Sequence, residues 1–123
     1  MTSRVLMIAM VSLTLSTGVG AEGKGPNGGI VVKAEDHPIE FVFNDREIVF
    51  YIDDHDGKPL PTRGLTARAV VQAGGKTRTI ALSPAEPNRF VGQIEAPLGA
   101  NARVVFSTVI HGHPLQARFV TPR

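Results

Sequence analysis

The side chains best suited to chemistry in this chain are its four histidines, each of which lies near other polar residues. They fall in the segment His37–Glu40, in the run Asp53-Asp54-His55-Asp56, and on either side of Gly112. Neutral imidazole is a borderline ligand and carboxylates complete its coordination shell, so this set suits Zn²⁺, Cu²⁺ or Ni²⁺. We therefore take six residues as candidate metal ligands: His37, Glu40, Asp53, His55, His111 and His113.

Sulfur chemistry is almost absent from the sequence. The chain has no cysteine, and its three methionines all lie within the first ten residues. Disulfides, thiol nucleophiles, zinc–thiolate sites and iron–sulfur clusters are thereby excluded. If the first segment is removed on export, the remaining chain also lacks the soft ligands that select Cu(I).

Other ion-binding and catalytic patterns fit poorly. The run around His55 resembles a calcium loop, but Ile52 stands where an EF-hand has its first ligand and Arg63 where it has its bidentate glutamate. Neither Ser83 nor Ser107 lies in a Gly-x-Ser-x-Gly context. No glycine-rich loop leads into a helix, as a phosphate-binding loop would. We therefore expect a protein that is not an enzyme.

The first residues have the pattern of an export signal. A short basic start with Arg4 is followed by an apolar stretch over 5–16 and by the small residues Val19-Gly20-Ala21. The pattern predicts a cleavable signal peptide over 1–21, hence a periplasmic protein, because the apolar stretch is too short to span a membrane. We expect a flexible glycine-rich leader over 22–29, one domain over 30–123, and no membrane span in the mature chain.

The remaining chain has the two-residue periodicity of β-strands. Ile39–Phe43 and Ile48–Ile52 alternate around a turn at Asn44–Arg46, which predicts a hairpin. Gly74-Gly75 predicts a second hairpin, and Gly112-His113 a third with a type II′ turn. With an opening strand over 30–34 and another over 89–95, these segments predict an all-β fold. We expect an antiparallel, immunoglobulin-like β-sandwich of about seven or eight short strands.

This topology also predicts where the histidines lie. If every connection reverses the chain, alternate connections lie at the same end of the domain. Counting from the first strand places all four histidines at one end. A turn centred near Asp45 also brings His37 and Pro38 opposite Asp53 and Asp54, with His55 just beyond.

Charge is distributed unevenly along the chain. Residues 22–56 contain nine acidic and three basic residues, whereas residues 57–123 contain nine basic and two acidic residues. The bases are spread singly along predicted strands, with one tyrosine in the whole chain, so we expect no nucleic-acid partner. Attraction between the two halves of one domain is the simpler interpretation.

Three segments resemble a known group of proteins. Pro26-Asn27-Gly28-Gly29-Ile30-Val31-Val32, His37-Pro38-Ile39-Glu40-Phe41-Val42 and Tyr51-Ile52-Asp53-Asp54-His55-Asp56-Gly57-Lys58-Pro59 are similar to small bacterial periplasmic proteins and adaptor segments associated with heavy-metal efflux. The resemblance implies an immunoglobulin-like fold, an association with metal handling, and envelope efflux components as partners. His37, Glu40 and His55 match the pattern of that group, whereas Asn27 stands where its first histidine would be.

Two functions follow from these observations. In the first, the protein binds a divalent metal ion or delivers it in the periplasm, with a link to heavy-metal efflux. In the second, it is an envelope interaction domain that docks on another periplasmic protein and has no metal role, and its histidines are ordinary turn residues.

Overall fold

The computed structural model describes residues 21–123, and every regular element in that range is a strand. Residues 1–20, which hold nearly all of the expected signal peptide, lie outside the described residues. Within 21–123 no helix has the length and apolar character that a membrane span requires. The strands in chain order are β1 (Ala21–Lys24), β2 (Ile30–Ala34), β3 (His37–Phe43), β4 (Glu47–Ile52), β5 (Ala67–Ala73), β6 (Lys76–Ala85), β7 (Arg89–Gln93), β8 (Arg103–Ile110) and β9 (His113–Val120).

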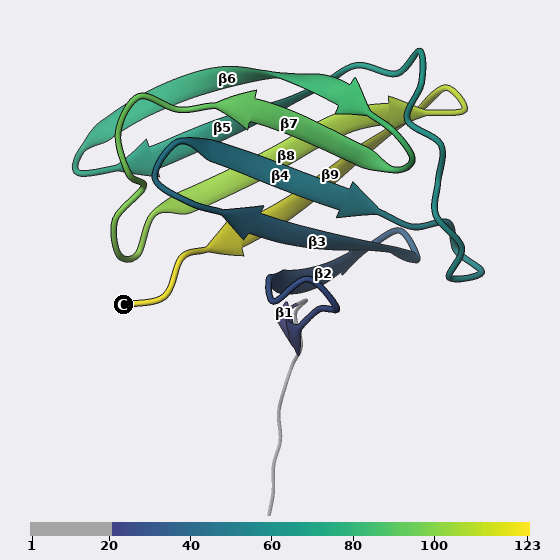
Figure 1. The fold of residues 1–123 in the computed structure, drawn as a ribbon, viewed down its shortest axis with the longest axis horizontal. Helices are drawn as coiled ribbons and strands as arrows, with labels where there is room; N and C mark the ends of the chain where they lie inside the picture. Colours follow the sequence, from purple (N-terminus) through teal and green to yellow (C-terminus); the bar gives the residue numbers. More distant parts are fainter. Residues whose placement is uncertain (1–20) are drawn as a thin grey trace, which may run out of the picture.

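The strands form one continuous antiparallel sheet in the order β1-β2-β3-β4-β7-β6-β5-β8-β9. Strand β6 belongs to both halves of this sheet, because its first part pairs with β5 and its last three residues pair with β7. The sheet curls at this switch until β2 lies against β9, and the two halves cross in Figure 1. The antiparallel all-β prediction is confirmed, whereas the immunoglobulin-like sandwich stays a prediction.

Aromatic side chains join the two halves across the core. Phe50 stacks on Phe106 with ring centroids 4.7 Å apart, and Phe41 meets Phe119 at 5.2 Å. These rings are almost fully buried. Phe41 and Phe50 lie on the face predicted by the alternation in their two strands, because side chains two residues apart point to the same side of a strand.

The three predicted hairpins are present, but the turn of the last one is shifted by one residue. Ile110 pairs with His113, so His111 and Gly112 are the turn residues. Both have positive φ, 52° and 80°, which is the geometry of a type I′ turn and not of the expected type II′ turn. His113 is therefore the first residue of β9 and not a turn residue.

The glycine-rich segment 22–29, expected to be a flexible leader, is attached to the sheet. Its first residues belong to β1, which pairs with β2. Its remainder folds into a loop closed by a hydrogen bond of 2.9 Å from the Gly25 amide to the Gly29 carbonyl. Glycine content alone does not predict this attachment, because it does not show whether a fixed acceptor such as Glu40 lies nearby.

Four connections lie at the same end of the sheet, as predicted from chain reversals. They are the β2–β3 turn, the β4–β5 loop, the β6–β7 turn and the β8–β9 turn, all at the right of Figure 1. The register of β3 and β4, with Ile39 opposite Ile52, extends this end by one more pair through a hydrogen bond of 3.0 Å from the Asp53 amide to the Pro38 carbonyl.

Candidate functional site

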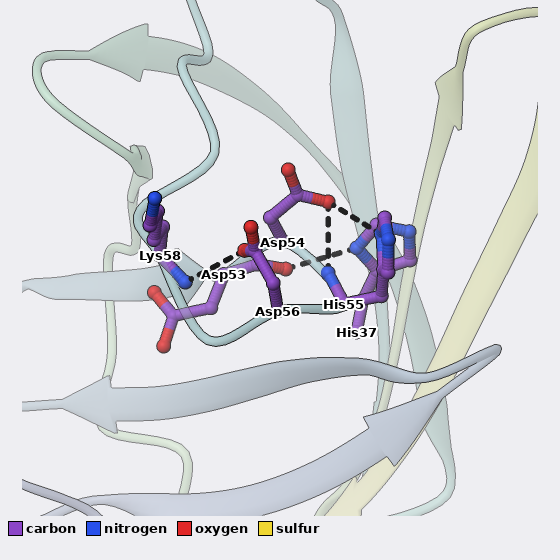
Figure 2. Close-up of polar contacts among 6 residues, drawn as sticks. All are labelled: His37, Asp53, Asp54, His55, Asp56 and Lys58. Atoms are coloured by element: carbon purple, nitrogen blue, oxygen red, sulfur yellow. Dashed lines mark hydrogen bonds and ion pairs between the residues drawn. The ribbon is translucent and has the colours of Figure 1, made fainter.

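The β3–β4 hairpin brings two of the candidate ligands together. His37 begins β3, and His55 lies three residues beyond the end of β4. Their imidazole rings meet edge to face, with centroids 6.4 Å apart and an interplanar angle of 86°. Figure 2 shows the two rings side by side at the end of the hairpin. We call these two residues the histidine pair.

Each ring of the histidine pair is held through its Nδ1 atom. His37 Nδ1 lies 2.9 Å from the backbone carbonyl oxygen of Asp53, and His55 Nδ1 lies 2.9 Å from Oδ1 of Asp54. A carbonyl or carboxylate oxygen accepts only, so Nδ1 carries the hydrogen in both rings. In the neutral imidazole this leaves the lone pair on Nε2 of each ring, which is the atom that can ligate a metal ion.

A tight loop after β4 positions His55. The Gly57 amide donates to the Asp54 carbonyl at 2.9 Å, and Gly57 has a φ of 86°, which glycine adopts without strain. The Asp54 amide donates back to the Lys58 carbonyl at 2.6 Å. The loop is thereby closed on both sides, while 72% of the His55 side-chain surface stays exposed.

The two aspartates before His55 have different surroundings. The backbone amide of His55 donates to Asp54, which lowers the pKa of that carboxyl from 3.8 and keeps it ionised as an acceptor for the His55 ring. Burial raises the pKa of Asp53 from the same value, and the charge of Glu40 adds to this shift against the hydrogen bond from Asn88. Figure 2 shows the Asp53 carboxylate turned away from the histidine pair, so only its backbone carbonyl serves the site.

Glu40, another candidate ligand, is committed to the loop that follows β1. Its carboxylate accepts hydrogen bonds from the Asn27 amide at 2.9 Å, from Asn27 Nδ2 at 3.0 Å and from the Gly29 amide at 2.7 Å. Only 5% of Glu40 is exposed, because this loop covers it on the outer side of β3. The carboxylate therefore holds the N-terminal loop on the sheet.

The remaining candidates, His111 and His113, lie at the β8–β9 turn and are exposed. They share an end of the sheet with the histidine pair, but no hydrogen bond or ring contact within residues 21–123 joins them to it. The end of the sheet at which His111 and His113 lie is thus predicted correctly, whereas convergence of all four histidines is not observed.

The structure brings together two of the six candidate ligands, His37 and His55. No group of three or more His, Cys, Asp or Glu side chains in residues 21–123 is arranged to hold a metal ion. Two residues that fix the site were not among the candidates: Asp54, which accepts from the His55 ring, and Asn88, which donates to the Ile52 carbonyl and to Asp53. Asp54 alone had a sequence signal, since a carboxylate next to a histidine in a turn is placed to accept from its ring. Comparison with protein-family models, with curated proteins and with solved structures gives no match.

Proposed function

We propose that this protein is a non-enzymatic binding module that captures a divalent transition metal ion, Cu²⁺, Zn²⁺ or Ni²⁺, at the histidine pair. The observation that carries the proposal is the shared orientation of the two rings, each donating its Nδ1 hydrogen to a fixed oxygen. Metal-binding histidines commonly have this second hydrogen bond, because it fixes the tautomer and makes Nε2 a better ligand.

The distance between the rings is compatible with one shared ion. Two imidazoles on one ion have centroids about 5 to 6 Å apart, given metal–nitrogen bonds of roughly 2.0 to 2.1 Å. The observed separation is 6.4 Å, and the exposed His55 ring can close the small difference by rotation. His37 is only partly exposed and is held by the backbone, so it provides the fixed half of the site.

Two imidazoles leave coordination positions for water or for a group from another molecule. A site that is open on one side exchanges its ion more readily than a closed four-ligand site, and this suits delivery better than storage. A periplasmic address and a link to heavy-metal efflux complete the proposal. They are supported by the pattern of residues 1–21 and by the sequence resemblance around His37 and His55.

Calorimetric titration of the untagged protein with each of the three ions tests the proposal. We expect at least one ion to bind with a dissociation constant in the micromolar range. Replacing the histidine pair by alanine, in H37A/H55A, is expected to weaken binding at least tenfold, because both Nε2 ligands are lost.

The matched control is H111A/H113A, which removes the same number of exposed imidazoles from the same end of the sheet. Affinity within twofold of the original protein is expected for this control. Equal losses in the two variants would show nonspecific binding to surface histidines. That result, or the absence of micromolar binding for all three ions, would reject the proposal and favour an interaction domain without a metal role.

A further inference from the structure

One half of the sheet has strands with no acidic residue. Strands β5, β6, β8 and β9 contain neither Asp nor Glu, but they carry five basic residues: Arg68, Lys76, Arg78, Arg103 and Arg118. Within residues 21–123 the only arginine in an ion pair is Arg63, which contacts Glu86. The guanidinium groups of these strands are therefore available to an anion from outside the chain.

Register gathers one of these arginines with two neutral hydrogen-bonding side chains. Arg68 on β5 lies directly opposite Ser107 on β8, which lies directly opposite Gln116 on β9. Neighbouring strands are about 4.8 Å apart, so the row spans roughly 10 Å on the outer face. Its guanidinium, hydroxyl and amide groups can all donate hydrogen bonds.

This row lies in a pocket of about 370 Å³. Val109 and Pro114, which also face each other across β8 and β9, form an apolar wall beside it, and Val109 is 52% exposed. The Thr108 hydroxyl donates to the Thr66 carbonyl at 2.6 Å and ties the β4–β5 loop to β8 next to the row. The pocket thus combines hydrogen-bond donors with apolar surface, the usual composition of a small-molecule site.

We propose that this pocket binds the oxyanion of a small organic acid, a carboxylate or a phosphate monoester, whose apolar part packs on Val109 and Pro114. Arg68 supplies the charge and, through its planar fork, two parallel hydrogen bonds to the oxyanion. Ser107 and Gln116 donate to the remaining oxygen lone pairs. The site shares no residue with the histidine pair, so the two proposals stand or fall separately.

Titration of the full protein, followed by the backbone amide signals of Ser107 and Gln116 in NMR spectra, tests this inference. The probes are butanoate, butyl phosphate, inorganic phosphate and butanol at constant ionic strength. We expect at least one butyl anion to shift both signals and to bind more tightly than inorganic phosphate and butanol. Whichever of butanoate and butyl phosphate has the lower dissociation constant shows whether carboxylate or phosphate is the preferred group.

Two variants separate specific recognition from general attraction. R68Q is expected to weaken binding of the preferred anion about tenfold or more, because a charge-assisted bidentate contact is lost. R103Q removes the same charge from the same face but outside the pocket, and affinity within twofold is expected. Equal losses in R68Q and R103Q, butanol binding as well as the anions, or unmoved Ser107 and Gln116 signals would overturn the inference.

Discussion

His37 and His55 lie edge to face at the end of one hairpin, but different parts of the chain hold their rings. The acceptor of His37 is the backbone carbonyl of Asp53, and the acceptor of His55 is the side chain of Asp54. A backbone acceptor survives any side-chain substitution, whereas a carboxylate acceptor does not. Neighbouring aspartates therefore have different roles at the site, and substitution can separate them.

The first prediction uses this difference between the two aspartates. If the histidine pair binds a metal ion, D54N is expected to weaken the affinity about tenfold. The substituted amide keeps an oxygen for the His55 ring but loses the negative charge that makes Nε2 a better ligand, and changing the group that accepts from a ligating histidine typically costs about 10- to 100-fold. D53N keeps the carbonyl that His37 uses and is expected to change affinity by less than threefold. Calorimetry on both variants measures this. A larger loss in D53N than in D54N would contradict the assigned roles.

The second prediction concerns Glu40 and the N-terminal loop. In E40Q the remaining oxygen can still accept from both backbone amides, which share Oε2, but these hydrogen bonds are no longer made to a charged acceptor. The new NH₂ group stands in place of Oε1, where it faces the Asn27 Nδ2 donor. We expect a loss of about 2 to 3 kcal/mol in the free energy of unfolding, measured in urea. The Gly29 amide should also exchange its hydrogen faster. E95Q, at an exposed position, is the control and should stay within about 0.5 kcal/mol.

The third prediction follows from the raised pKa of Asp53. The Asp53 carboxyl holds its proton more tightly in the folded chain than in the unfolded chain. Ionisation of Asp53 therefore lowers the free energy of unfolding as the pH rises from 3.8 through the raised pKa of the folded state. D53N removes this cost and keeps an oxygen for the hydrogen bond from Asn88. In metal-free buffer, the stability of D53N relative to the original protein should increase with pH across that window and then stay constant. A difference that is independent of pH would contradict the shift.

The sequence predicts the pairing of the β3–β4 and β5–β6 hairpins, because a tight turn leaves little freedom in pairing, but it misplaces the β8–β9 turn by one residue. Counting outward from Asp45 places His37 and Pro38 opposite Asp53 and Asp54. In the structure the Asp53 amide donates to the Pro38 carbonyl, and the His37 ring reaches the Asp53 carbonyl. Counting reversals also places four connections at one end of the sheet. This counting does not give the distances between the four connections. Those distances depend on how the sheet curves, and therefore on the residue at which β6 changes its pairing partner from β5 to β7. For this reason the sequence alone groups His111 and His113 with the histidine pair.

Glu40 shows a second reason why the site differs from the prediction. Alternation correctly places its side chain on the outer face of β3, where a carboxylate is normally free to ligate. The N-terminal loop crosses that face, and its N–H groups donate hydrogen bonds to both oxygens of the carboxylate. Asn27 and Glu40 are thirteen positions apart, and a contact at this separation has no periodic signature in the sequence, so it was not predicted.

The fourth prediction compares two adjacent glycines of the N-terminal loop. A methyl group on Gly29 would collide with the Phe41 carbonyl oxygen, so G29A is expected to cost about 1 to 3 kcal/mol or more. Gly28 has open space around it but a φ of +80°, so G28A is expected to cost only about 1 kcal/mol. The free energies of unfolding of both variants, measured in urea, show which substitution costs more. A larger cost for G28A would mean that backbone conformation outweighs the close approach.

The fifth prediction concerns His111 in the β8–β9 turn. This residue has a φ of 52°, a left-handed conformation that asparagine tolerates better than histidine, and Asn-Gly is the favoured type I′ pair. H111N should therefore stabilise the protein by about 0.5 to 1 kcal/mol, which raises the melting temperature by several degrees in a domain of this size. H113N, in strand β9, lacks this effect and serves as the control.

H111N also tests the location of the metal site independently of alanine substitution. The variant is expected to be more stable than the original protein, so a change in affinity could not be attributed to a damaged fold. If the histidine pair provides the two protein ligands, the dissociation constants of H111N and the original protein should agree within twofold. Weaker binding by the more stable variant would instead place an imidazole of the β8–β9 turn in the coordination shell.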